Sequence, residues 1–131
     1  IRKGAMEFVL FNIGSMSFGI KLEDVLEIFN VSQIQHRFLF KDKDIDVAYL
    51  STLFEIEDKN EDGKKNVIVS RINGVEKAVV VDSVSEIMRI EPLQIKELPM
   101  LIKAMIRVQC FWGVVRHGDR LSLLVDLNRL E

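Results

Sequence analysis

An internal repeat constrains the fold of this chain more than any other feature of its sequence. Shifted by 59 residues, the segment Phe8–Val31 aligns without a gap on Val67–Ile90. The apolar positions coincide, the turn Gly14-Ser15 falls on Asn73-Gly74, and four of the 24 aligned residues are identical. Because a repeated pattern encodes a repeated structural unit, we predict two similar halves. Each half would have a strand, a tight turn, a second strand and a V-x-E-I segment.

The second copy of the repeat contains three adjacent valines, Val79, Val80 and Val81. β-branched side chains favour strands. An apolar run that is continuous, not alternating, indicates a strand that is buried on both faces. This strand is therefore expected inside a folded domain and not in an isolated surface hairpin.

Short apolar runs separated by tight turns recur along the whole chain. Hairpins are predicted around Gly14-Ser15, around Asn73-Gly74 and around His117-Gly118-Asp119. Asn-Gly is the strongest short signal for a hairpin turn. Strands bounded by such turns are typical of all-β proteins, either small barrels or a sandwich.

Helix is expected only in short pieces. Turns of helix are predicted at 51–54 and at the end of the chain, 127–131. A helical turn that leads into a strand is predicted at 22–28. In the segment 98–105 the apolar residues follow helical spacing, and Pro99 is acceptable in a first helical turn.

The length of 131 residues fits a single domain. The most polar stretch, 55–65, is predicted to be a solvated linker. It would separate a first subdomain, mainly 7–54, from a second, mainly 66–126, which is closed by the turn at 127–131. The whole chain, 1–131, is thus interpreted as one domain with two subdomains.

Composition argues against several classes of function. A net charge of −2 provides no basic surface for nucleic acid or for an anionic membrane. The apolar runs are too short to span a bilayer, and no signal peptide is visible. A single cysteine, Cys110, rules out an internal disulfide framework and is compatible with a reducing cytoplasm.

The sequence does not suggest an enzyme. His36 and His117 lie in dissimilar predicted loops, and Cys110 has apolar neighbours, which are typical of an inert buried thiol. A nucleophile with a base and an orienting group is not apparent, nor is a phosphate-binding glycine motif. Two histidines and one cysteine do not suggest a zinc site. No catalytic residue, metal or cofactor is predicted.

Three segments together resemble the family of the chemotaxis coupling protein CheW. They are EFVLFNIGSMSFGIKLEDVLEI (7–28), NVIVSRINGVEKAVVVDSVSEI (66–87) and FWGVVRHGDRLSLLVDLNRL (111–130). Their order and spacing follow the family pattern over nearly the whole chain. The resemblance implies an all-β fold of two five-stranded SH3-like barrels around a shared hydrophobic core, in agreement with the repeat.

The resemblance also implies a function. The family is a non-catalytic adaptor that links the cytoplasmic tip of chemoreceptors to the histidine kinase CheA, whose regulatory domain has the same fold. The expected location is the cytoplasm, at membrane-associated receptor arrays. Two alternatives stay open: the chain is the regulatory domain of a CheA-type kinase, or it is a barrel protein that binds a small ligand in the groove between the barrels.

By the same resemblance, partner-binding residues are expected in two segments. One is the V-x-E-I segment, and the other corresponds to the family motif G-V-x-N-L-R-G, which falls on 36–42. The candidate partner-binding residues are Val25, Glu27, Ile28, His36, Lys41 and Asp42.

The second of these segments departs from the family pattern. The family's first glycine is replaced by His36, its arginine by Lys41 and its second glycine by Asp42. The following proline is replaced by Asp46. Lysine keeps the charge of arginine but not its bidentate fork, and aspartate lacks the conformational freedom of glycine. We therefore expect tighter binding to a kinase regulatory domain than to a receptor tip.

Overall fold

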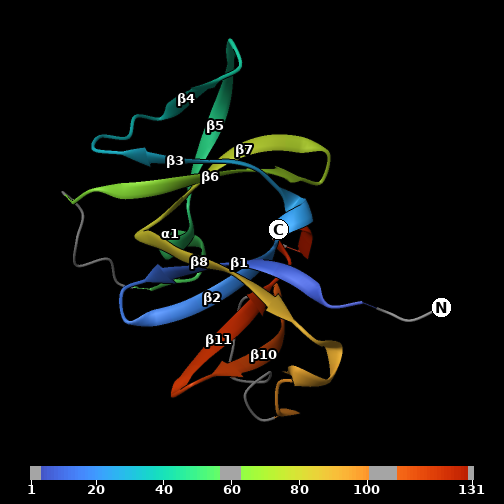
Figure 1. The fold of residues 1–131 in the computed structure, drawn as a ribbon. Coiled ribbons are helices and arrows are strands. Elements are labelled where there is room, and N and C mark those ends of the chain that lie inside the picture. The colour runs from blue at the N-terminus through green and yellow to red at the C-terminus, as the bar shows by residue number, and fades with distance from the viewer. Residues whose placement is uncertain (1–3, 57–62, 101–108, 130–131) are drawn as a thin grey trace.

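The computed structural model describes residues 4–56, 63–100 and 109–129 (Figure 1). The strands are β1 (Met6–Ile13), β2 (Met16–Lys21), β3 (Val25–Val31), β4 (Arg37–Phe40), β5 (Lys43–Tyr49), β6 (Lys65–Ile72), β7 (Val75–Val81), β8 (Ser83–Ile90), β9 (Ile95–Lys96), β10 (Phe111–His117) and β11 (Arg120–Val125). The helical pieces are η1 (Leu22–Asp24), α1 (Leu50–Leu53), η2 (Pro92–Gln94) and η3 (Leu127–Arg129). The predicted all-β class is confirmed, and helix occurs only in short pieces within the described residues.

The strands form two sheets, and each sheet curls into an SH3-like barrel. Barrel A is the six-stranded sheet with the order β8-β1-β2-β11-β10-β9, and barrel B is the five-stranded sheet with the order β3-β6-β7-β5-β4. Barrel B occupies the upper part and barrel A the lower part of Figure 1. The predicted pair of barrels is confirmed, with a sixth short strand, β9, at the edge of one sheet.

The sequence repeat is also a structural repeat. The 59-residue shift carries the bounds of β1 onto those of β6, and it places β2 on β7 and β3 on β8. Each hairpin stays in one barrel, but the third strand of each repeat crosses to the other barrel. There β3 pairs with β6, and β8 pairs with β1. Each repeat therefore supplies the strand that completes the other barrel.

This exchange changes how the chain is divided between the barrels. Barrel B is built from 25–81, whereas barrel A combines β1 and β2 with the strands after residue 82. The expected subdomains, 7–54 and 66–126, are thus not the two barrels. The physical reason is that η1 and the bend at Asp82 redirect the chain to the opposite sheet after each hairpin.

The exchange explains why the apolar runs are continuous. Alternate residues of β1 and β6 point into their own barrel or into a core that the two barrels share. Val79, Val80 and Val81 are all buried, as predicted. The shared core includes Val9, Phe11, Ile13, Phe18, Ile68, Val79 and Val125. The separate barrel cores include Phe8, Leu10 and Leu124 in barrel A and Val67, Val69 and Val80 in barrel B.

Aromatic rings from distant parts of the chain meet in the shared core. The ring centroid of Phe18 on β2 lies 5.2 Å from that of Phe54, which follows α1, and 5.9 Å from that of Phe111 on β10. Aromatic pairs at such distances stabilise a core beyond the area that they bury. Phe111 is therefore a half-buried residue that packs against the shared core.

Two expectations concern the remaining segments. The predicted helix at 98–105 falls mostly on residues outside the described ranges. The predicted linker 55–65 ends one residue too late, because Lys65 is the first residue of β6 and forms an ion pair with Asp82. Within the described residues, the structure has no helix that is long and apolar enough to cross a membrane.

Candidate partner-binding surfaces

The V-x-E-I segment of the first repeat begins β3. Val25 and Ile28 are half-buried and pack against the shared core, while Glu27 is exposed. The register with β6 shifts between Val25 and Glu27, so Leu26 is the extra residue of a β-bulge. As a result Leu26, an apolar residue, is exposed at 39% of its surface.

The second V-x-E-I segment occupies the equivalent place on β8. The register with β1 shifts between Val84 and Glu86, so Ser85 is the bulged residue of β8. The 59-residue shift aligns Ser85 with Leu26, the bulged residue of β3. Glu86 is exposed, and 54% of Ile87 is exposed. Each segment therefore has an apolar residue and an acid at the surface. The acids Glu27 and Glu86 are equivalent in the repeat, whereas the exposed apolar residues Leu26 and Ile87 are not.

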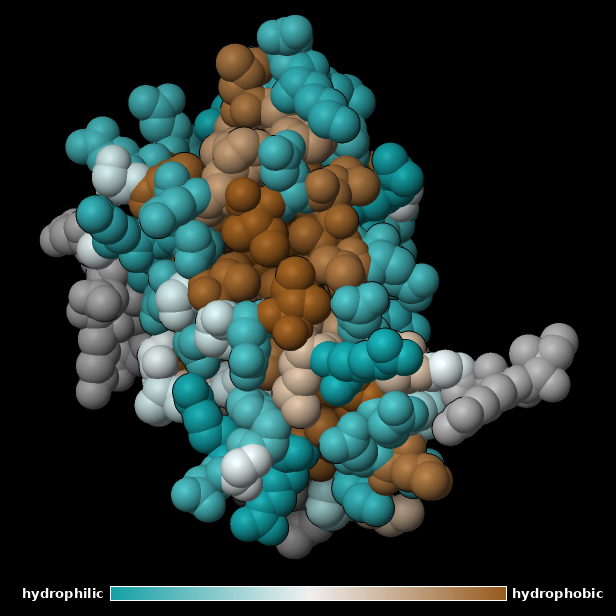
Figure 2. Space-filling view, viewed as in Figure 1, coloured by the Kyte–Doolittle hydropathy of each residue, from teal (hydrophilic) through white to brown (hydrophobic). Residues whose placement is uncertain are grey.

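The side chain of Asn66 joins these two strands. Its Nδ2 donates to the carbonyl oxygen of Phe29 on β3 (3.3 Å), and its Oδ1 accepts from the backbone N–H of Val84 on β8 (2.8 Å). Figure 2 shows apolar surface gathered in the centre of the face where β3 and β8 run in Figure 1. We call the apolar residues of these two segments the seam patch: Val25, Leu26, Ile28, Val84 and Ile87.

The other predicted residues lie on the β4–β5 hairpin, but at its two ends. His36 is exposed just before β4, whereas Lys41 and Asp42 form the two-residue turn after it. Both turn residues have positive φ angles, 49° and 64°. This is the pattern of a type I′ turn, which normally carries asparagine and glycine.

The structure therefore does not gather the six predicted residues into one site. Val25, Glu27 and Ile28 lie together on β3. The turn at Lys41 stands at the far end of the hairpin, and β4 approaches β3 through the rings of Phe29 and Phe38, whose centroids are 5.2 Å apart.

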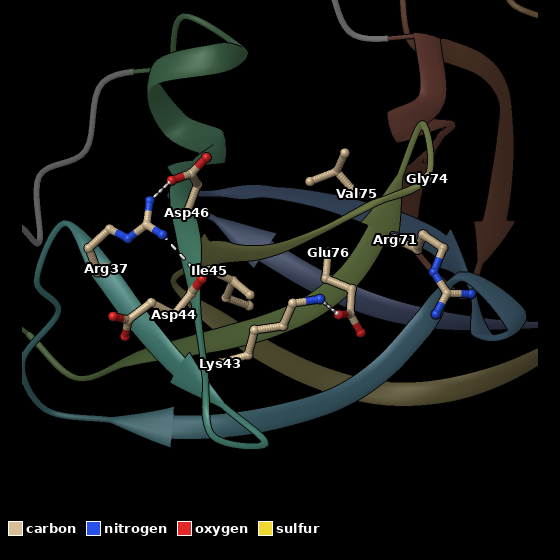
Figure 3. Close-up of a pocket in the computed structure, with 9 residues that line it drawn as sticks. All are labelled: Arg37, Lys43, Asp44, Ile45, Asp46, Arg71, Gly74, Val75 and Glu76. Atoms are coloured by element: carbon tan, nitrogen blue, oxygen red, sulfur yellow. Dashed lines mark hydrogen bonds and ion pairs between the residues drawn. The ribbon is translucent and has the colours of Figure 1, made fainter.

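A charged groove lies beside the same hairpin, and sequence reasoning missed it (Figure 3). It has a volume of about 540 Å³. Arg37 pairs with Asp46 on one side, and Lys43 reaches Glu76 at 3.4 Å across it. Arg71 stands on the opposite side in Figure 3, without an ion pair to any described residue. Charges of both signs line this groove.

An apolar groove lies at the end of barrel A, and it too was missed. Its volume is about 770 Å³, and it lies between the β1–β2 turn, the β10–β11 hairpin and the segment 98–99. Its apolar lining residues are Met16, Leu98, Pro99, Val114, Leu121 and Leu123, and its polar ones are Ser15, Ser17, Asp119 and Arg120. Both grooves escaped detection because their residues are far apart in the sequence.

Beside the apolar groove lies a short chain of buried hydroxyl groups. The Oγ atoms of Ser17 and Ser122 are 2.6 Å apart, and Nε2 of His117 lies 2.9 Å from Ser122 Oγ. His117, which was predicted to lie in the turn, is instead the last residue of β10 and pairs with Arg120, so the turn consists of Gly118 and Asp119. These contacts satisfy polar groups that would otherwise be costly to bury.

Burial changes the acidity of two ionisable groups, the thiol of Cys110 and the carboxyl of Asp24. Cys110 is buried in the shared core, and burial raises the pKa of its thiol to about 11. Burial, with a smaller effect of the neighbouring Glu23, also raises the pKa of Asp24. No set of three or more histidine, cysteine or acidic side chains in the described ranges is placed to hold a metal ion.

Comparison with known proteins agrees with this architecture. The sequence profile of the CheW-like domain matches residues 7–131. The crystal structure of the scaffolding protein TtCheW from Thermoanaerobacter tengcongensis superposes with a TM-score of 0.84 at 20% sequence identity. That match covers 96% of this chain and 92% of the other. Comparison with curated protein sequences gives no match.

Proposed function

The chain belongs to the CheW-like domain family, and we propose that it is a non-catalytic adaptor that couples chemoreceptors to a CheA-type histidine kinase. The observation that carries this proposal is the seam patch, in which the exposed Leu26 and Ile87 lie with the half-buried Val25, Ile28 and Val84. Exposed apolar side chains of this kind mark a protein contact, and the exposed acids Glu27 and Glu86 lie in the same two segments.

The proposed contacts use two separate regions. In the first, Val25, Glu27 and Ile28 on β3 contribute to the seam patch together with the equivalent residues of β8. In the second, the β4–β5 hairpin presents Lys41 and Asp42 at its turn. Two separate regions suit an adaptor, because partners can then be held at the same time. The adaptor would be recruited from the cytoplasm to membrane-associated receptor arrays.

The altered hairpin supports a preference between the two partners. Lys41 lies over the ring of Phe40, with Nζ 5.3 Å from the ring centroid, and it lacks the planar fork of arginine. Asp42 adds an acid beside it. Together these changes could cost about 1–3 kcal/mol, or roughly one to two decades of affinity, at a receptor contact. We propose that the kinase regulatory domain binds more tightly than the receptor tip.

Paired titrations test this proposal. The protein is titrated against a receptor-tip fragment and against a kinase regulatory domain. The double variant Lys41→Arg/Asp42→Gly should strengthen receptor binding and leave kinase binding unchanged. Equal affinity of the unmodified protein for both partners, or no effect of the double variant, contradicts the proposed role of this hairpin.

The seam patch is tested separately. Ile87→Asp places a charge on the patch and should weaken binding of a partner at least about tenfold, since 1.4 kcal/mol of lost contact suffices. Leu93→Asp is the matched control, because Leu93 on η2 is 89% exposed and lies outside the patch. If both variants bind like the unmodified protein, the patch is not the docking surface.

The CheW-like match fits a second candidate function equally well: the regulatory domain of a CheA-type kinase, which has the same fold. The sequence of the full-length gene distinguishes the two, since a kinase domain encoded upstream would decide for the second candidate.

A further inference from the structure

The turn between β6 and β7 holds the only Asn-Gly pair of the sequence, Asn73-Gly74. Each of the other five asparagines is followed by a residue with a side chain, and three of those residues are β-branched: Ile13, Val31 and Val67. A Cβ atom, above all a branched one, crowds the backbone nitrogen of the residue that carries it. The nitrogen of Gly74 lacks this shield, so an asparagine side chain can approach it most closely.

The fold leaves the side chain of Asn73 and the nitrogen of Gly74 free. The exposed side-chain amide of Asn73 forms no hydrogen bond with a described residue, and neither does the backbone N–H of Gly74. A Cβ atom at Gly74 would have nothing within 4 Å, so the space around this residue is open. In contrast, the amide of Asn66 is held at both ends between β3 and β8.

The turn is held instead through the backbone of Asn73. Its N–H donates to Oδ1 of Asn128 on η3 at 2.8 Å, and the N–H of Asn128 donates to Oδ1 of Asp126 at 3.0 Å. The φ angles of Asn73 and Gly74, 52° and 82°, are those of a closed type I′ turn. A five-membered ring between this side chain and the next nitrogen needs a different rotation about the Asn73 Cα–C bond. The turn must therefore open before such a ring can form, and the hydrogen bond to Asn128 opposes the opening.

We propose that Asn73 is a site of spontaneous deamidation and that Asn128 slows the reaction by holding the turn closed. When the turn opens, the nitrogen of Gly74 attacks Cγ of Asn73, a new C–N bond forms, and the side-chain nitrogen leaves with the displaced proton as ammonia. Water then adds to one of the two carbonyl groups of the cyclic imide, and the ring opens to aspartate or to isoaspartate. The proposal does not depend on the adaptor function, since it concerns only the isolated protein and water.

Both products change the charged groove, because Gly74 is one of its lining residues (Figure 3). One neutral amide becomes one carboxylate, which takes the net charge of the chain from −2 to −3. The new carboxylate belongs to the same turn as Arg71, a lining residue without an ion pair to any described residue. Isoaspartate also inserts a methylene group into the backbone, which disturbs the pairing of Ile72 with Val75. Deamidation thus alters the charge and the shape of one wall of the groove.

Peptide mapping by mass spectrometry tests the proposed site on the folded full-length protein, which is incubated at mildly alkaline pH and digested at acidic pH. Aspartate and isoaspartate should accumulate at position 73, and Asn30 should react much more slowly. Asn30 is the matched internal control, because it is exposed and has no side-chain hydrogen bond to a described residue, but Val31 follows it. Equal rates at the two asparagines overturn the proposed site.

Two variants test the role of Asn128. Asn128→Ala removes the acceptor and should speed deamidation of Asn73 about threefold to tenfold, the range that one lost hydrogen bond gives in an opening equilibrium. Asn128→Asp is the matched control, because it keeps an acceptor oxygen, and its rate should stay close to that of the unmodified protein. Circular dichroism melts confirm that both variants are folded at the temperature of incubation. A rate for Asn128→Ala equal to that of the unmodified protein overturns the proposed restraint.

Anion-exchange chromatography tests the change of charge. The aged protein should form a more acidic species that elutes with the variant Asn73→Asp, which carries the aspartate product from the start. Asn73→Gln lengthens the side chain by one methylene group, so ring closure is slower and this species should not form on the same timescale. If Asn73→Gln forms the acidic species as fast as the unmodified protein, the charge arises elsewhere and the proposal is wrong.

Discussion

Lys41 and Asp42 have backbone angles that most side chains avoid. Their φ angles of 49° and 64° lie in the left-handed region, where the Cβ atom of an L-residue approaches its own backbone. The two-residue connection between Phe40 and Lys43 requires this conformation. The turn Asn73-Gly74 has the same conformation with the residue types that favour it. Lys41 is therefore strained because the two-residue connection imposes a left-handed conformation that a lysine side chain disfavours.

This comparison makes a prediction for stability. Lys41→Asn/Asp42→Gly should raise the free energy of unfolding by about 1–2 kcal/mol, because it removes left-handed strain from the turn. Urea denaturation measures the change. The reverse exchange at the other turn, Asn73→Lys/Gly74→Asp, should lower the stability by a similar amount. If neither exchange changes stability, the turn is not strained in the way that the angles indicate.

At the scale of single elements, the short strand β9 depends on the absence of a side chain. It pairs with β10 at Val114 and Val115, next to Gly113. A Cβ atom at Gly113 would lie 2.9 Å from Ile95 Cγ2 and 3.3 Å from the carbonyl oxygen of Lys96. The glycine therefore allows β9 to lie close against β10.

Gly113→Ala should destabilise the protein by about 1–3 kcal/mol, because the added methyl group overpacks this contact. Urea denaturation gives the size of the effect, and amide hydrogen exchange at Lys96 shows whether β9 is displaced. Gly4→Ala is the control, since nothing lies within 4 Å of a Cβ atom at that position. Equal stability of the two variants would show that β9 can shift away from the added methyl group without a loss of stability.

Elements and turns were well predicted from the sequence, because β1 and β6 bury both faces and so carry a strong apolar pattern. The exchange of β3 and β8 was not predicted. An apolar pattern tells which face of a strand is buried, but not which strand lies beside it. The β4–β5 hairpin and the β10–β11 hairpin also correspond to each other, because a shift of 77 residues carries the pair Arg37–Asp46 onto Val114–Leu123. This correspondence was not predicted, since the two hairpin sequences share little beyond Asp42 and Asp119.

The candidate site was predicted only in part. The V-x-E-I segment of β3 was named through family resemblance, and its role in binding stays a prediction. Its counterpart on β8, with Glu86 and Ile87, could have been named from the repeat alone. The grooves could not be inferred in the same way, because the residues that line each groove are far apart in the sequence.

At the scale of the whole molecule, the two barrels hold each other together. The carboxylate of Asp82, at the crossing between β7 and β8, accepts from the backbone N–H of Gly14 at 2.7 Å. It also pairs with Nζ of Lys65 at 2.7 Å. These contacts tie the first hairpin to the start of the second repeat. Together with the exchanged strands and the shared core, they make the two barrels one folding unit.

A cut between the repeats tests this interpretation. Fragments 1–56 and 63–131 each lack a strand that completes a barrel, because β3 needs β6 and β1 needs β8. Each fragment alone should be largely unfolded, and the two should fold together when they are mixed. Circular dichroism and thermal melts measure the folding of each fragment alone and of the mixture. A cooperative melt of either fragment alone contradicts a single folding unit.

The order of strands along the chain also decides when each barrel can close as the protein leaves the ribosome. Barrel B has all its strands once Val81 has been made. In barrel A the first hairpin waits on one edge for β8 and on the other for β11, which ends at Val125. At about 5–20 residues per second, the wait between Lys21 and Val125 is roughly 5–20 s. Unpaired strand edges invite aggregation, so the β1–β2 hairpin is exposed to aggregation for longer than any strand of barrel B.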